Sequence, residues 1–349
     1  MSVSMGLFCA CSSDNQVPEY RIQAGVARVS GKVSGSLPFE INEQTGAIAL
    51  STNNPLIAYD IQYDATIQAD GTFVLDVPVA CTHLGYIRFD FYEGFIYLSP
   101  GDETRLDISF AKNGEKHISM LSNSRFTGDD MTNIVNVMLD FFTNAPRGSG
   151  TVIIQPEEFS KETMEKIEKM SAMVKRHTEL SEAAGQFVTN SLKLMYVVNS
   201  LFAYEESMRS RDKDANEDAK EKNDFTPLTP EKSYYACLKQ FDLNNSAYLF
   251  CDYYFMTMQA ILSDKVLNIP PIGDTPIPDW LKEVKAIIAD YIGADTGLFY
   301  DVLAANAYSK QFKDGKLLSD KQKENIRHYY TENTSFAEIL FARDKDLAK

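Results

Sequence analysis

The sequence lacks any long hydrophobic run. In its 349 residues, no window approaches the ~20 consecutive apolar residues that a membrane-spanning helix needs. Positive charge is also scarce: 34 Lys and Arg face 49 Asp and Glu, and the formal net charge is −15. A surface that neutralises nucleic-acid phosphates or anionic lipid headgroups needs clustered Lys and Arg. The sequence therefore predicts no membrane-spanning helix and no nucleic-acid partner.

Motifs of several enzyme classes are missing as well. The chain has neither a G-x-S-x-G elbow nor a G-x-G-x-x-G loop after a strand, and the GSGT at residues 148–151 lacks the Lys-Ser/Thr pair of a phosphate loop. Its four histidines stand far apart without metal-ligand spacing; they are His83, His117, His177 and His328. We therefore expect no catalytic residues, no cofactor and no metal site in this chain.

Cysteine is sparse, and its spacing is informative. Thiol-disulfide exchange normally uses a C-x-x-C pair at a helix start, which this chain lacks, and Cys81 stands alone in a region that we expect to be buried. Cys237 and Cys251 flank a polar break at residues 242–245, so two antiparallel helices could bring them side by side. A disulfide there would close a loop of about 14 residues and stabilise the fold by ~3 kcal/mol. Two free buried thiols are the alternative, because helix axes lie about 8–10 Å apart and both side chains would have to point inward.

The N-terminal segment, residues 1–19, resembles the end of a bacterial lipoprotein signal followed by a polar tether. Ala10 precedes Cys11, which is the candidate for lipidation, whereas the bulky Phe8 before Cys9 fits the pattern less well. No Lys or Arg precedes Arg21, and the apolar stretch is shorter than a signal requires, so we expect the true start to lie upstream. The alternative is a frayed terminus with two incidental cysteines.

Residues 20–125 have the period of strands. Apolar residues alternate at 73–77, at 106–110 and at 118–120. The dipeptides at 70–71 and 113–114 predict tight hairpins, and a further turn dipeptide stands at 100–101. About seven short strands at this spacing are typical of a small antiparallel β-sandwich. The predicted fold class is α+β, with this sandwich domain followed by an all-helical domain at residues 126–349.

The helical domain contains a very polar insertion at about residues 205–226. Asp212, Asp214, Asn216 and Asp218 alternate there like the start of a calcium loop. However, Glu217 stands where such a loop needs glycine, and Asn223 stands where it needs glutamate. The segment is therefore interpreted as a solvated helix end and loop.

The stretch from residue 229 to residue 262 is the densest apolar and aromatic run of the chain. Thr229 and Pro230 read as an N-cap and first helical position, which predicts a helix to about Phe241 and a second helix from about Tyr248 to Leu262. Its aromatic side chains are expected in the core, and an exposed, glycan-binding platform is the alternative. They are Tyr234, Tyr235, Tyr248, Tyr253, Tyr254 and Phe255.

With these pieces in order, residues 21–345 resemble the N-terminal half of the TlpA-like, thioredoxin-fold thiol-disulfide oxidoreductase lipoproteins of Bacteroides and relatives. The resemblance rests on four segments: DGTF at 70–73, YLSPGDETRLDI at 97–108, GLFYDVL at 297–303 and SFAEILFARDKDL at 335–347. It implies a lipid-anchored protein of the cell envelope that faces the periplasm. The family places a catalytic thioredoxin domain next, and no catalytic residue of that domain corresponds to a position here.

Three functions follow from these observations. The first is a non-catalytic accessory or binding module of an envelope lipoprotein, whose partner would be a thioredoxin-fold domain or an envelope client protein. The second is a truncated thiol-disulfide oxidoreductase whose catalytic domain lies beyond residue 349. The third is a glycan- or ligand-binding envelope protein that uses the aromatic stretch.

Overall fold

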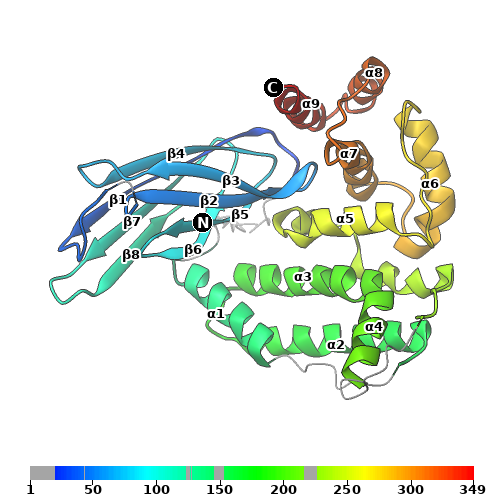
Figure 1. Cartoon of the computed structure of the whole chain (residues 1–349), viewed down its shortest axis with the longest axis horizontal. Coiled ribbons are helices and arrows are strands. Elements are labelled where there is room, and N and C mark those ends of the chain that lie inside the picture. Colours follow the sequence, from blue (N-terminus) through cyan, green and yellow to red (C-terminus); the bar gives the residue numbers. More distant parts are fainter. Residues whose placement is uncertain (1–19, 43, 123–125, 127, 145–152, 216–225) are drawn as a thin grey trace, which may run out of the picture.

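The computed structural model describes residues 20–42, 44–122, 126, 128–144, 153–215 and 226–349. It confirms the predicted α+β class, with a β-sandwich that lies beside a helical region (Figure 1). The strands are β1 (Gly25–Gly35), β2 (Ala47–Asn54), β3 (Ala58–Thr66), β4 (Thr72–Val79), β5 (His83–Phe89), β6 (Glu93–Leu98), β7 (Glu103–Phe110) and β8 (Lys116–Leu121).

Two four-stranded sheets form the sandwich, in the orders β4-β1-β7-β8 and β3-β2-β5-β6. Neighbouring strands are antiparallel except for β1 and β7, which pair in parallel from Arg28 opposite Glu103 to Gly35 opposite Phe110. This parallel pair refines the predicted antiparallel sandwich. β1 and β7 are the two central strands of one sheet. They are not joined by a hairpin, because the chain forms strands of the other sheet between them, so they can run in the same direction.

Alternating side chains fix which face of each strand is buried. In β4, Phe73, Leu75 and Val77 point into the core that both sheets share, while Val74 and Asp76 face outward. The turn at residues 113–114 closes the β7–β8 hairpin as predicted. The turn at residues 70–71 instead leads from β3 in one sheet to β4 in the other, so the expected hairpin there is wrong.

The helical region follows the sandwich. Its α-helices are α1 (Gly128–Asn144), α2 (Pro156–Val174), α3 (Glu182–Asn199), α4 (Tyr204–Ala215), α5 (Tyr253–Ser263), α6 (Ile277–Ile292), α7 (Leu298–Phe312), α8 (Asp320–Tyr329) and α9 (Ser335–Leu347). Short 3-10 segments are η1 (Leu201–Ala203), η2 (Lys232–Phe241) and η3 (Ser246–Phe250). Among the described residues, no helix combines the length and the apolar character that crossing a membrane requires.

The predicted helical hairpin in the aromatic stretch is only partly right. The first member is the 3-10 segment η2, which begins at Lys232 and has no side-chain cap. The second is split into η3 and α5. Ten residues with apolar side chains three or four positions apart fit either a 3-10 or an α-helical period, so the sequence alone could not separate the two.

The sequence contains two S-x-x-E/Q patterns that predict capping boxes, Ser319 with Gln322 and Ser335 with Glu338, and they have different outcomes. Ser319 accepts the Gln322 N–H, and the Gln322 side chain accepts the Ser319 N–H, so this box is formed. At the last helix the flanking residue is Thr334 rather than Ser335, and its hydroxyl donates to the Glu338 carboxylate instead of capping the backbone.

The two halves of the molecule share packing contacts. Ile22, Leu56, Ala80 and Cys81 come from the N-terminal half and lie in the core of the helical region. The buried side chain of Asn306 in α7 donates to the Pro55 carbonyl after β2 over 2.8 Å. These contacts fix the outward face of the β3-β2-β5-β6 sheet relative to the helices.

Candidate functional site

A groove runs along β2 on the outward face of the β3-β2-β5-β6 sheet. Ala47, Ala49 and Ser51 form its floor, because they alternate with Ile48 and Leu50, whose side chains are buried in the sandwich. Neighbouring strands carry larger outward side chains, so the small residues of β2 leave a depression between them. The part of the groove nearest the β5–β6 turn encloses about 820 Å³.

Strand register places one row of charged residues across this groove. Ala49 pairs with Asp64 on β3 and with Arg88 on β5, and Arg88 pairs with Glu93 on β6. Directly paired residues of antiparallel strands place their side chains on the same face. Across the four strands of the sheet, the row therefore consists of the Asp64 carboxylate, the Ala49 methyl group, the Arg88 guanidinium and the Glu93 carboxylate.

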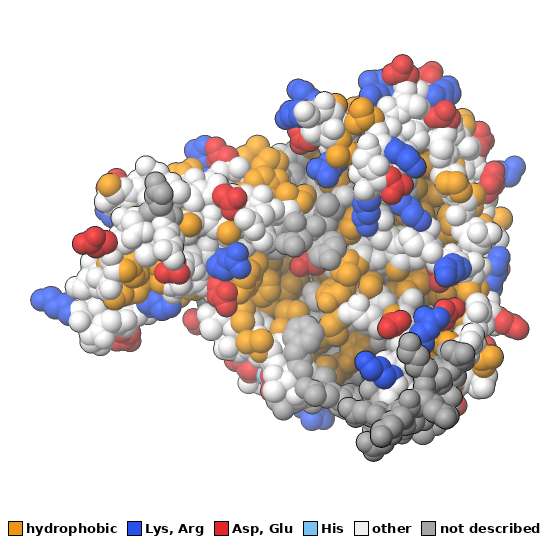
Figure 2. All heavy atoms as spheres, in the orientation of Figure 1, with side chains coloured by type: hydrophobic (Ala, Val, Ile, Leu, Met, Phe, Trp, Pro, Cys, Tyr) orange, Lys and Arg blue, Asp and Glu red, His pale blue; other side chains and the backbone are white. Residues whose placement is uncertain are grey.

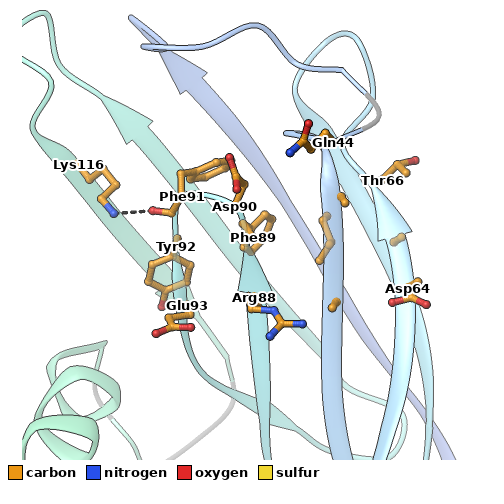
Figure 3. Close-up of a pocket in the computed structure, with 14 residues that line it drawn as sticks. Gln44, Asp64, Thr66, Arg88, Phe89, Asp90, Phe91, Tyr92, Glu93 and Lys116 are labelled. Carbon is orange, nitrogen blue, oxygen red and sulfur yellow. Dashed lines mark hydrogen bonds between the residues drawn. The ribbon is translucent and has the colours of Figure 1, made fainter.

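Arg88 is the central charge of this row. Its side chain is exposed and extends toward β2 (Figure 3), and no described residue forms an ion pair or a hydrogen bond with its guanidinium. Asp64 instead accepts a 2.8 Å hydrogen bond from the Gln62 amide. A planar cation with five free donors above a floor of methyl groups suits an incoming carboxylate or carbonyl group.

The β5–β6 turn closes one end of the groove. Phe91 stacks on Phe39 and is held further by Lys116 of β8, whose Nζ donates to the Phe91 carbonyl over 2.6 Å. Tyr92 and Asp90 lie beside Phe91 in the same turn (Figure 3). This end is therefore built from residues of both sheets and is held in place by packing.

The other end of the groove meets the helical region. A smaller cavity of about 280 Å³ lies there, with Tyr86, Phe95 and Asp252 among its lining residues. Burial, and then a hydrogen bond to Glu93, raise the pKa of Tyr86. Figure 2 shows hydrophobic side chains gathered in the middle of this face, between the sandwich and the helices, with most charged side chains farther out.

A buried polar cluster lies beneath this end. His83 is fully buried, its Nδ1 contacts the Cys81 carbonyl at 2.9 Å, and its Nε2 contacts the Thr52 hydroxyl. Burial lowers the pKa of His83 to about 4, although the contact with Cys81 opposes the shift, so the ring is neutral at pH 7. Asn53 donates to Asp252 and ties β2 to the start of α5.

The cysteines in the described part of the chain do not form a reactive thiol site. The structure has Cys81, Cys237 and Cys251 as free thiols, so it does not form the Cys237–Cys251 disulfide that the sequence left open. Of the two free, buried thiols expected as the alternative, Cys251 is buried and Cys237 is part-buried. The Cys237 thiol donates to the Tyr234 carbonyl within η2, and the Cys251 thiol, directly after η3, donates to the Ala247 carbonyl. Burial raises the pKa of Cys251 to about 12 and also raises the pKa values of Cys81 and Cys237. Protonated, buried thiols are poor nucleophiles for disulfide exchange.

The aromatic stretch is core rather than a binding platform. Tyr234, Tyr235, Tyr248, Tyr254 and Phe255 are each at most 2% exposed, and Tyr253 is half-buried. The hydroxyls of Tyr234, Tyr248 and Tyr254 donate to backbone carbonyls within the helical region. The exposed stacking surface that glycan binding by this stretch would need is therefore not there.

The remaining candidate residues lie apart or outside the described part of the chain. The histidines are not brought together: His83 is buried in the sandwich, His177 contacts Glu179 at 2.6 Å, and His117 and His328 are exposed. Within the described ranges, no three His, Cys, Asp or Glu side chains are placed to hold a metal ion. The lipidation candidate Cys11 lies outside the described residues, as does most of the calcium-like segment at 212–223.

The groove is not evident from the sequence, although part of its signal is present there. Small residues alternate with Ile48 and Leu50, which marks the outward face of β2 as flat. Strand pairing was the missing information, because only the register brings Arg88 next to Ala49. Comparison of the chain with models of known protein families and with curated proteins finds no match.

Proposed function

We propose that this chain is a non-catalytic binding module of a cell-envelope lipoprotein, and that the groove along β2 receives a segment of a partner protein. The observation that carries the proposal is Arg88, a free guanidinium held above a floor of Ala47 and Ala49. A groove of this volume is within the range of pockets that hold ligands or peptide side chains.

The chemistry of the groove favours binding over catalysis. None of its charged residues is buried against a partner that would activate it as a nucleophile or a general base, as catalysis would require. The described thiols are protonated; Cys81 and Cys251 lie in the core, and Cys237 is part-buried against it. Redox chemistry, if the native protein has it, belongs to a thioredoxin-fold domain outside this chain, and that domain or an envelope client is the proposed partner.

Anchoring at Cys11 would place the module on the periplasmic side of a membrane. The formal charge of −15 keeps its surface from binding anionic lipid headgroups, so the membrane would be reached only through the lipid chain. In this arrangement the groove stays available to a soluble or tethered partner.

Photo-cross-linking tests the proposal directly. A benzoylphenylalanine at position 49 should cross-link the module to a discrete partner in the cell envelope, because this position lies on the groove floor. The matched control is position 30, on the outward face of the other sheet, which should give no such product. Equal yields from positions 49 and 30 would show that the groove has no special role.

A further inference from the structure

A separate cavity, of about 550 Å³, lies where residues 20–22 meet the helical region, and it shares no lining residue with the groove. Four separate segments meet around it: residues 20–22, the loop between η2 and η3, the start of α7, and the α8–α9 loop with the start of α9. A cavity of this volume has room for a small organic molecule.

Hydrogen bonds between these segments preform the cavity. Asn333 of the α8–α9 loop donates to the Ile22 carbonyl over 2.8 Å. Asn244 donates to the Thr296 carbonyl and accepts the Phe299 N–H, which caps the start of α7. The cavity is therefore fixed by contacts between distant segments, one of them between residues 311 positions apart, and its walls are set before any ligand arrives.

The aromatic wall is equally fixed. Tyr330 stacks on Phe336 with ring centroids 4.5 Å apart, and its hydroxyl donates to the Asp301 carbonyl over 2.8 Å. Tyr329 packs edge-on against Tyr330, and Tyr20 also lines the cavity. Aromatic faces attract organic cations as well as apolar groups.

Asp301 in α7 is the distinctive polar group of this cavity. Its Oδ1 accepts a 2.7 Å hydrogen bond from the Tyr329 hydroxyl, whereas its Oδ2 has no hydrogen-bond partner among the described residues. Burial raises the pKa of Asp301, the hydrogen bond from Tyr329 and the charge of Lys285 oppose that shift, and the charge of Glu332 adds to it. A cation close to Asp301 and Glu332 would offset both the cost of burying the Asp301 carboxylate and its repulsion by Glu332.

We propose that this cavity binds the primary ammonium group of a small organic amine, with Asp301 as its anchor and the aromatic rings around its alkyl chain. The ammonium would donate to the free Oδ2 of Asp301, and Glu332 at the rim would add a second negative charge. Arg21 is the one cationic residue among the lining residues, and it lies exposed, bonded to Gln23. An anionic ligand would meet two carboxylates, so the lining selects against it.

The test compares two probes of the same shape on the full chain. Isothermal titration with n-pentylamine should show saturable binding, whereas 1-pentanol, which replaces the ammonium by a hydroxyl, should bind about tenfold or more weakly, as for loss of a charge-assisted hydrogen bond. This comparison needs no variant. Equal binding of the two probes, or no saturable binding of the amine, would overturn the proposal.

Variants then locate the anchor. Asp301→Asn keeps an acceptor for Tyr329 but removes the charge, and it should weaken n-pentylamine binding by about ten- to hundredfold. Glu332→Gln, at an exposed position, should have a smaller effect. Asp290→Asn removes one charge at an exposed position of α6 that does not line this cavity, and it serves as the matched control, with unchanged binding. Full binding by Asp301→Asn, or a larger loss in Glu332→Gln, would refute the assignment of Asp301.

Discussion

Replacing Asn306 by alanine should weaken the junction between the sandwich and the helices. The Asn306 side chain is fully buried, donates to the Pro55 carbonyl over 2.8 Å, and accepts from the Gln259 amide over 3.0 Å. It also donates to the Val302 carbonyl one turn earlier in α7. Alanine removes these contacts without disturbing the backbone of the helix.

The expected cost follows from the groups that lose a partner. The Pro55 carbonyl and the Gln259 amide each lose a good hydrogen bond at a buried junction, and each loss costs about 1–3 kcal/mol. Because Gln259 keeps a longer contact with the Asn306 carbonyl, we expect a total of about 2–4 kcal/mol in the free energy of unfolding.

Urea unfolding measures this loss with two signals. The single tryptophan, Trp280, is buried in α6 and reports on the helical region, while far-UV circular dichroism reports on the whole chain. Asn325→Ala is the matched control, because Asn325 donates to the carbonyls of Asp274 and Thr275 within the helical region. Hydrogen exchange near Ile57, in the turn between β2 and β3, should accelerate in Asn306→Ala and stay unchanged in Asn325→Ala. A loss below about 0.5 kcal/mol, the size of an ordinary surface change, would refute this account of the junction.

Three further predictions concern the sandwich and the thiols. The pKa of His83 is lowered to about 4 in the folded state, so between pH 6.5 and 4 the unfolded chain binds a proton that the folded chain does not. The free energy of unfolding should therefore fall by up to about 3 kcal/mol as the pH drops through that window. Urea titrations of His83→Gln should lack this pH-dependent loss. Gly31→Ala places a methyl group 1.8 Å from the Leu106 carbonyl and should cost at least about 2 kcal/mol in thermal or urea unfolding, whereas Gly185→Ala, which meets open space in α3, should stabilise by about 0.5–1 kcal/mol. The Cys251 thiol should react with a disulfide reagent only after unfolding, and rapid labelling of the native protein at this residue would contradict its burial.

Much of the fold could be predicted from local patterns. The alternation at Phe73, Leu75 and Val77 fixed a strand with one buried face, and helical spacing and Ser319 fixed helices in the second half. Local patterns do not report which strands pair, so the parallel contact of β1 with β7 was missed. They also do not separate a 3-10 turn from an α-helical one over ten residues, which explains η2.

The candidate sites depend on contacts that are distant in the sequence. Arg88 reaches Ala49 only through the register of β5 on β2, and Asp301 gains its environment from a loop near residue 332 and from residues 20–22. The burial of the thiols was partly foreseen, since Cys81 was expected in the core. A sequence shows which side chains are available, but the long-range packing decides which of them meet.

The central claim is that a charged groove, and not a thiol, carries the function of this chain. The most direct test is the cross-linking yield from benzoylphenylalanine at position 49 in two backgrounds, Arg88→Glu and Cys237→Ala, since Cys237 is the least buried of the described thiols. We predict that Arg88→Glu abolishes the cross-linked product and that Cys237→Ala leaves it unchanged. A product that survives Arg88→Glu and disappears with Cys237→Ala would contradict the claim.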